Sequence, residues 1–120
     1  MERWVAGYEK AWRTPGTDML AELFTPDVVY LVSPWAEPVV GLDALSSLWE
    51  AERDGPDGSF SFDAQVLALD METAVVRVDV DYHHPLRSWR DLWVVVFALG
   101  GRCARFEEWP FSPTTPDGHA

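Results

Sequence analysis

Hydrophobic residues in the first half of the chain follow the 3.6-residue period of α-helices. Trp4, Tyr8, Ala11 and Trp12 recur at this spacing, and Pro15-Gly16 ends the helix that they predict. The wide apolar stripe indicates a helix that covers the core of the domain.

Two more helices are predicted before residue 55. Thr17 or Asp18 can cap a short helix that ends near Phe24, and Gly41 with Asp43 introduces a longer one. The longer helix carries one apolar stripe, which consists of Leu42, Leu45, Leu48 and Trp49.

The hydrophobic period changes to two after the turn-forming run 54–58. The strands predicted along the whole chain are 28–32, 60–69, 73–82, 89–99 and 102–109. The last four are joined by short turns, among them a hairpin at Gly100-Gly101, so an antiparallel meander is expected.

Helices in the first half and long strands in the second predict an α+β fold. We expect three N-terminal helices to cover one face of a curved, mainly antiparallel sheet and to leave a pocket between the two layers. One domain is expected to span residues 1–120, with a loose, proline-containing tail at 110–120.

The strand from Thr73 to Tyr82 combines charge with strict alternation. Arg77, Asp79 and Asp81 share one face, and valines occupy the other. A strand that faces water can carry such charges without a further role. A later strand of the same meander ends in Phe106-Glu107-Glu108-Trp109 and allows a second interpretation, in which these charges gather at a site.

The segment from Leu92 to Phe97 is apolar at odd and even positions alike. The helices can cover only one face of the sheet, so the other face needs a partner surface. A second copy of the chain supplies that surface most simply, and a homodimer through the outer sheet face is therefore predicted.

The composition narrows the classes of partner. The 120 residues carry a formal net charge of −11, which argues against nucleic acid and anionic membranes. The single cysteine, Cys103, cannot form an internal disulfide. The start of the chain lacks the features of a signal peptide, and no apolar run has membrane-spanning length. We expect a soluble, cytoplasmic protein.

Two motifs resemble those of a known superfamily. Leu23-Phe24-Thr25-Pro26-Asp27 precedes the first strand, and Gly41-Leu42-Asp43-Ala44-Leu45 opens the third helix. With the order of elements from Trp4 to Trp109, they are similar to SnoaL-like members of the nuclear-transport-factor-2-like superfamily. The resemblance implies a cone-shaped α+β barrel with a pocket, often dimeric. The superfamily includes polyketide cyclases, ketosteroid isomerases, limonene-type epoxide hydrolases and many non-enzymes, so the fold does not select a function.

The ketosteroid isomerase pattern matches at one position only. Tyr8 corresponds to the tyrosine that donates to the substrate oxyanion in that family. The general-base aspartate falls on Val32, and the protonated aspartate falls near Trp93. Valine cannot move a proton, so steroid-type isomerisation is not expected.

The limonene-type epoxide hydrolase pattern matches more closely. Arg77-Val78-Asp79-Val80 resembles that family's Arg-Val-Asp-Val strand, and Phe106-Glu107-Glu108-Trp109 resembles its ending with an acid between aromatic residues. The resemblance implies Glu108 as water-activating base, Asp79 as acid, Arg77 as the bridge between them and Tyr30 as the water-positioning residue. In that family an asparagine holds the water together with the tyrosine, and Val32 stands at its position here. The water-activating base of the family is an aspartate, and Glu108 stands at its position.

The chain contains seven tryptophans, most of which must belong to the core. Trp12, Trp93 and Trp35 are the ones predicted at the pocket, where flat rings suit an apolar or cyclic ligand. The predicted ligand-binding residues are Tyr8, Trp12, Val32, Trp35 and Trp93. Asp81 and Asp91 are expected to be rim or surface charges, and Arg90 is expected to face away from them.

No motif for a metal or an organic cofactor is present in the sequence. His83 and His84 are adjacent, so in a strand they would face opposite ways and could not share a metal. The predicted function is a pocket that binds a small apolar or cyclic organic molecule, with epoxide-hydrolase-like catalysis by Arg77, Asp79 and Glu108. A binding or dimeric interaction module without catalysis is the alternative from another class.

Overall fold

The computed structural model describes residues 1–52, 60–83 and 86–113. Its helices are α1 (Glu2–Arg13), α2 (Leu20–Leu23) and α3 (Leu42–Glu52). Its strands are β1 (Phe24–Leu31), β2 (Val39–Val40), β3 (Phe60–Asp70), β4 (Thr73–His83), β5 (Leu86–Phe97) and β6 (Cys103–Phe111). The predicted α+β class is confirmed, whereas the predicted turn at 54–58 lies outside the described residues.

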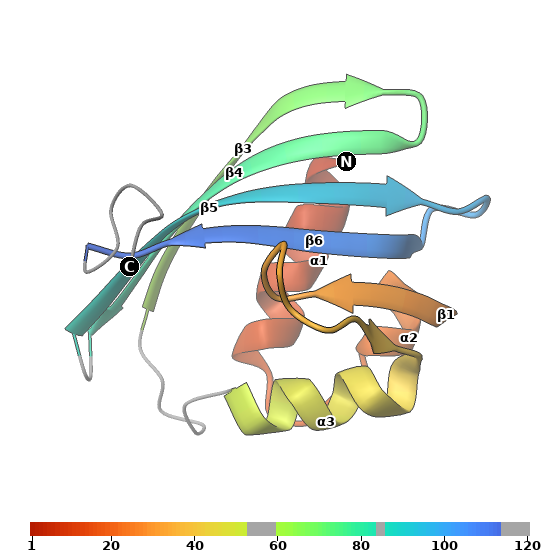
Figure 1. Cartoon of the computed structure of the whole chain (residues 1–120), viewed down its shortest axis with the longest axis horizontal. Coiled ribbons are helices and arrows are strands. Elements are labelled where there is room, and N and C mark those ends of the chain that lie inside the picture. Colours follow the sequence, from red (N-terminus) through yellow and green to blue (C-terminus); the bar gives the residue numbers. More distant parts are fainter. Residues whose placement is uncertain (53–59, 84–85, 114–120) are drawn as a thin grey trace.

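All the described strands belong to one curved sheet with the order β2-β1-β6-β5-β4-β3. Strands β3 to β6 form the predicted antiparallel meander, and β1 runs parallel to β6. The sheet curves around α1 without closing into a barrel, because β2 and β3 remain its two edges (Figure 1).

Helix α1 places its aromatic stripe on the inner face of this sheet. The Trp4 ring makes edge contacts with Phe24 and Phe97, each at 5.6 Å, and its Nε1 donates to the carbonyl of Leu23 at 2.9 Å. The helix begins without a side-chain cap. Burial of the stripe therefore stabilises α1 more than its own propensity does.

Helix α3 begins at a turn that requires glycine. Gly41 has a φ of +91°, a value that side-chain-bearing residues rarely adopt. Its N–H donates to the carbonyl of Val28 at 2.9 Å, and its carbonyl accepts the N–H of Leu45 at 3.0 Å. These two bonds fix the start of α3 against β1.

The first strand and the second helix differ from prediction. Strand β1 begins at Phe24 rather than Val28, because parallel pairing with β6 extends it past Pro26 through an irregular register. The second helix is correspondingly one turn long. The two-residue strand β2 was not predicted, since only its pairing with β1 distinguishes it from a loop.

The strand register decides which residues reach the space under the sheet. Residues directly opposite each other on neighbouring strands point to the same face. Val76, Trp93 and Glu108 form one such row across β4, β5 and β6, and this row faces the helices. The next row, made of Arg77, Leu92 and Trp109, consequently faces outward.

Candidate functional site

A cavity of about 300 Å³ lies between the helices and the inner face of the sheet. Its walls are mostly aromatic and aliphatic, with few polar groups, which is typical of sites for small organic molecules. It is lined by Tyr8, Trp12, Tyr30, Val32, Leu48, Trp49, Glu52, Phe60, Phe62, Val80, Tyr82, Arg87, Trp89, Trp93, Glu108 and Pro110.

Most of the residues predicted at the pocket line this cavity. They are Tyr8, Trp12, Tyr30, Val32, Trp93 and Glu108. Trp35 does not line it and is 98% exposed, so the structure contradicts its predicted place at the pocket. Trp35 lies in the turn that follows β1.

Two tyrosines and one carboxyl group form a hydrogen-bonded chain in the cavity. The hydroxyl groups of Tyr8 and Tyr30 lie 2.9 Å apart, and the Tyr30 hydroxyl donates to Oε1 of Glu108 at 3.4 Å. These residues come from α1, β1 and β6, so only the folded sheet with its covering helix brings them together.

The ring of Phe106 packs against both tyrosine rings. It is fully buried and stacks on Tyr8 and Tyr30, with ring centroids at 5.5 Å and 4.6 Å and interplanar angles of 13° in both pairs. Trp93 contacts its edge at 5.0 Å. This packing limits the freedom of the two hydroxyl groups near Glu108.

The environment of Glu108 favours its protonated form. Burial raises the pKa of Glu108 well above the ordinary value, and the charge of Asp91 and a hydrogen bond with Asp91 raise it further. Burial also raises the pKa of Tyr8 and of Tyr30, so both hydroxyl groups remain proton donors at neutral pH.

Asp91 is buried beside Glu108 and is not the surface charge that was predicted. It is 7% exposed, and burial raises its pKa to about 6. Its register opposite Val78 turns it inward, as Trp93 is turned two residues later on the same strand. The sequence contained this signal, because Asp91 is two residues before Trp93, which was predicted to point inward, and residues two apart on a strand share a face.

Arg77 and Asp79 lie on the outer face of the sheet, away from Glu108. Arg77 Nε contacts Asp79 Oδ1 at 3.5 Å, and the two side chains are 56% and 30% exposed. The expectation that they converge with Glu108 on one cavity is therefore wrong. Strict alternation on β4 turns Val78 and Val80 inward and these two charged residues outward.

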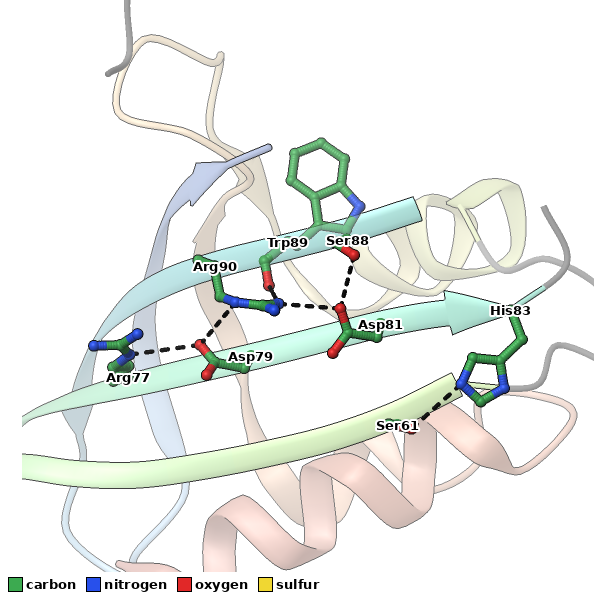
Figure 2. Close-up of polar contacts among 8 residues, drawn as sticks. All are labelled: Ser61, Arg77, Asp79, Asp81, His83, Ser88, Trp89 and Arg90. Atoms are coloured by element: carbon green, nitrogen blue, oxygen red, sulfur yellow. Dashed lines mark hydrogen bonds and ion pairs between the residues drawn. The ribbon is translucent and has the colours of Figure 1, made fainter. Parts of the chain in front are cut away.

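The outer charges form an ion-pair network on β4 and β5 (Figure 2). Arg90 reaches Asp79 at 3.7 Å and Asp81 at 3.2 Å, and the Ser88 hydroxyl donates to Asp81 at 2.7 Å. The bonds from Ser88 and Arg90 lower the pKa of Asp81. The expectation that Arg90 faces away from Asp81 is therefore wrong, whereas Arg90 does face away from the inward-pointing Asp91. Such exposed pairs contribute little to stability.

Several cavity residues were missed from the sequence. They are Leu48, Trp49, Glu52, Phe60, Phe62, Val80, Tyr82, Arg87, Trp89 and Pro110. Trp12 donates through Nε1 to the hydroxyl of Tyr82 at 3.2 Å, which links α1 to the end of β4. The missed residues on β3, β4 and β5 are spaced two apart, which places each pair on one face, but only the curvature of the sheet shows that they reach one cavity.

The described residues contain no group of three His, Cys, Asp or Glu side chains placed to hold a metal ion. His84, one of the two adjacent histidines, lies outside the described residues. Cys103 is buried, and burial raises its pKa to about 12, so its thiol is a poor nucleophile. None of the described helices is long and apolar enough to cross a membrane.

The curved sheet, its covering helices and the cavity between them define a pocket fold of the nuclear-transport-factor-2-like kind. The chain belongs to the SnoaL-like domain family, whose model matches residues 2–108. No curated protein matches the chain in sequence.

Solved structures share this fold. A candidate polyketide cyclase from Sinorhizobium meliloti is 25% identical, with a TM-score of 0.68 over 88% of this chain and 93% of that chain. A protein of unknown function from Burkholderia xenovorans, described as NTF-2 like, is 12% identical, with a TM-score of 0.72 over 93% and 83% of the two chains. A steroid delta-isomerase from Pseudomonas aeruginosa is 17% identical, with a TM-score of 0.67 over 96% and 82%. The last two likenesses concern the fold alone.

Proposed function

We propose that the protein binds a small, mostly apolar cyclic organic molecule and exchanges a proton with it through Glu108. The observation that carries this proposal is the place of Glu108, a carboxyl group with a raised pKa on the wall of an aromatic cavity, beside the Tyr30 hydroxyl. A carboxyl group whose pKa approaches the working pH exchanges protons in both directions.

The proposed step is a proton transfer at a carbon next to a ring carbonyl. Glu108 as carboxylate takes the proton, a C–H bond breaks and an O–H bond forms, and the electron pair moves to the carbonyl oxygen. The Tyr30 hydroxyl, which also lines the cavity, can donate to that oxygen as negative charge develops. Return of the proton completes the exchange.

Hydrolysis of a cyclic epoxide is the second candidate, and the contact between Tyr30 and Glu108 favours it. The proton that Glu108 accepts would then belong to a water held by Tyr30. Val32 provides no polar group for that water. The outward position of Asp79 and Arg77 removes the proposed acid and bridge, so the ring oxygen would need its proton from another group.

A screen in deuterated water tests both candidates. Cyclic ketones should gain deuterium next to the carbonyl at least about 100-fold faster with protein than in buffer, measured by proton NMR. The same samples with cyclic epoxides report diol formation. If neither panel reacts but a ring compound binds the cavity, the pocket is a binding module without catalysis.

Tryptophan fluorescence should report ligand binding inside the cavity. Trp12 and Trp93 line it, whereas Trp35 is fully exposed outside it. With a cyclic enone as probe, we expect Trp12→Phe and Trp93→Phe each to reduce the quenching that the ligand causes. Trp35→Phe is the matched control and should leave the quenching unchanged. Equal quenching in all three variants would place the ligand elsewhere.

We also propose a homodimer through the outer face of the sheet. Leu92 and Trp109 are opposite each other in the register and are 41% and 42% exposed there. The adjacent ion-pair network carries both signs of charge, which suits a twofold, self-complementary contact. A second copy of the chain would cover this apolar row.

Val94 comes two residues after Leu92 on β5 and faces the same way. Val94→Lys should convert the dimer to a monomer, because the new charge would be buried between the two sheets. Light scattering at micromolar concentration measures the mass, and circular dichroism checks the fold. Leu99→Lys, at a fully exposed hairpin position, is the control and should stay dimeric. A monomeric wild-type protein would contradict the proposal.

A further inference from the structure

Asp91 occupies an unusual position for an aspartate. It is 7% exposed, it does not line the cavity, and it lies diagonally beside Glu108 on the neighbouring strand. Its Oδ1 is buried without a hydrogen-bond partner among the described residues, although the side-chain N–H of Trp93 acts on the carboxylate and lowers its pKa. A buried carboxylate oxygen normally has a hydrogen-bond partner, so the position of Oδ1 needs an explanation.

A proton between the two carboxyl groups supplies the missing partner. Asp91 and Glu108 are diagonal neighbours on the inner face of adjacent strands, since Trp93 lies opposite Glu108 and Asp91 comes two residues earlier. A hydrogen bond between the two carboxyl groups shifts the pKa of each, and two ionised carboxylates in this arrangement would repel. With one proton between them, one group donates and the other accepts, and the pair carries a single negative charge.

We infer that Asp91 is a positioning residue, which shares one proton with Glu108 and so lets Glu108 exchange a proton with the cavity ligand. The inference rests on the proposed function. When the shared proton is on Asp91, Glu108 is a carboxylate and can accept the proton of the ligand. When that proton returns to the ligand, the pair is restored with no net change of atoms or charge.

The other ionisable groups around the pair and the cavity come from five elements. Tyr8 on α1 and Tyr30 on β1 remain protonated, Glu52 at the end of α3 adds a weak negative field at Glu108, and Asp79 on β4 adds one at Asp91. Arg87 on β5 is the one cation among the described residues that line the cavity. Asp91 is among the groups that shift the pKa of Glu108, and Arg87 is not.

The test is a carbon-13 NMR titration of the side-chain carboxyl groups, which requires no ligand. In the wild type, the resonances of Asp91 and Glu108 should both show the same two titration steps, since the apparent pKa values belong to the pair. Assignment follows from the loss of one resonance in Glu108→Gln and of the other in Asp91→Asn.

Asp91→Asn should lower the pKa of Glu108 by at least about one unit, a tenfold change in proton affinity. The substitution keeps the shape, removes a negative charge and offers an amide N–H to the Glu108 carboxylate. Asp81→Asn is the matched control on the outer face of β4, with the same change in net charge, and should leave the pKa of Glu108 unchanged.

Independent single-step titration of the two groups in the wild type would overturn the inference, even if Asp91→Asn failed to fold. An unchanged pKa of Glu108 in folded Asp91→Asn would overturn it as well. The proposed function fails separately. If the titration shows a coupled pair but Glu108→Gln exchanges deuterium into cyclic ketones as fast as the wild type, the pair exists and the proposed catalysis is wrong.

Discussion

Phe106→Ala is expected to lower the free energy of unfolding by about 3–5 kcal/mol, the usual loss when a buried phenylalanine is truncated in a packed core. Phe106 has no exposed surface and contacts Trp4, Tyr8, Phe24, Tyr30 and Trp93. These rings come from α1, β1 and β5, so a collapse of one element cannot fill the cavity left behind.

Urea unfolding followed by circular dichroism measures this loss. Phe106→Leu is the matched control, because it keeps much of the apolar volume and should cost less than half as much. The two tyrosines should also lose their fixed ring positions in the alanine variant. A loss below about 1 kcal/mol for Phe106→Ala would mean that the aromatic cluster is not the centre of the core.

Glu108→Gln is expected to lower the rate of proton exchange into the ligand by about 10²–10⁴-fold. Glutamine keeps the shape of the side chain and can still contact Tyr30, but it cannot accept and return the proton. The rate of deuterium incorporation into the fastest cyclic ketone, or of diol formation from the fastest epoxide, measures the effect.

The neighbouring residue on β6 provides a matched control. Glu107 faces outward, where Trp109 Nε1 donates to it at 2.7 Å and Arg105 contacts it at 3.3 Å. Glu107→Gln makes the same chemical change one residue away and should retain the wild-type rate. Equal losses in the two variants would indicate a general effect of strand β6 rather than chemistry at Glu108.

Glu108→Gln should also change how the free energy of unfolding depends on pH. The pKa of Glu108 is raised in the folded protein. The folded state therefore keeps a proton on Glu108 up to a higher pH than the unfolded chain does. The free energy of unfolding should therefore decrease as the pH rises from the ordinary glutamate value through the raised value. Glu108→Gln removes this contribution and should give a flatter dependence.

Periodicity predicted the elements of the fold because each has a clear apolar face. The stripe of Trp4, Tyr8 and Trp12 identified α1, and the alternation of valines identified β4. The antiparallel meander followed from short turns such as Gly100-Gly101, where both glycines have positive φ. The parallel pairing of β1 with β6 could not be predicted in this way, since it joins segments far apart in the chain.

The site could be predicted only in part, because alternation groups residues by face without showing which face is inside. Arg77 and Asp79 were correctly placed on one face of β4, but that face is the outer one. Glu108 and Tyr30 were brought together as expected, at 3.4 Å. Asp91 was missed because charge suggested the surface, whereas its parity with Trp93 indicated the core.

The resemblance to known families predicted only some of the residues that form the site. The Arg77-Val78-Asp79-Val80 motif matches a catalytic pattern in sequence, yet its charged residues form surface ion pairs here. A motif specifies a site only when the register turns its side chains into the cavity. The acid beside Glu108 in this chain is instead Asp91, from the neighbouring strand.

The position of a bound ligand tests the central claim most directly. A crystal structure with the cyclic ketone that exchanges fastest, or with a cyclic enone in its place, shows where the ring lies. We predict that the ring occupies the cavity among Trp12, Trp93 and Tyr30, with its carbonyl oxygen or the adjacent carbon within hydrogen-bonding reach of Glu108. A ligand bound instead at Arg77 and Asp79 on the outer face, or a cavity that stays empty at saturating ligand, would contradict the account.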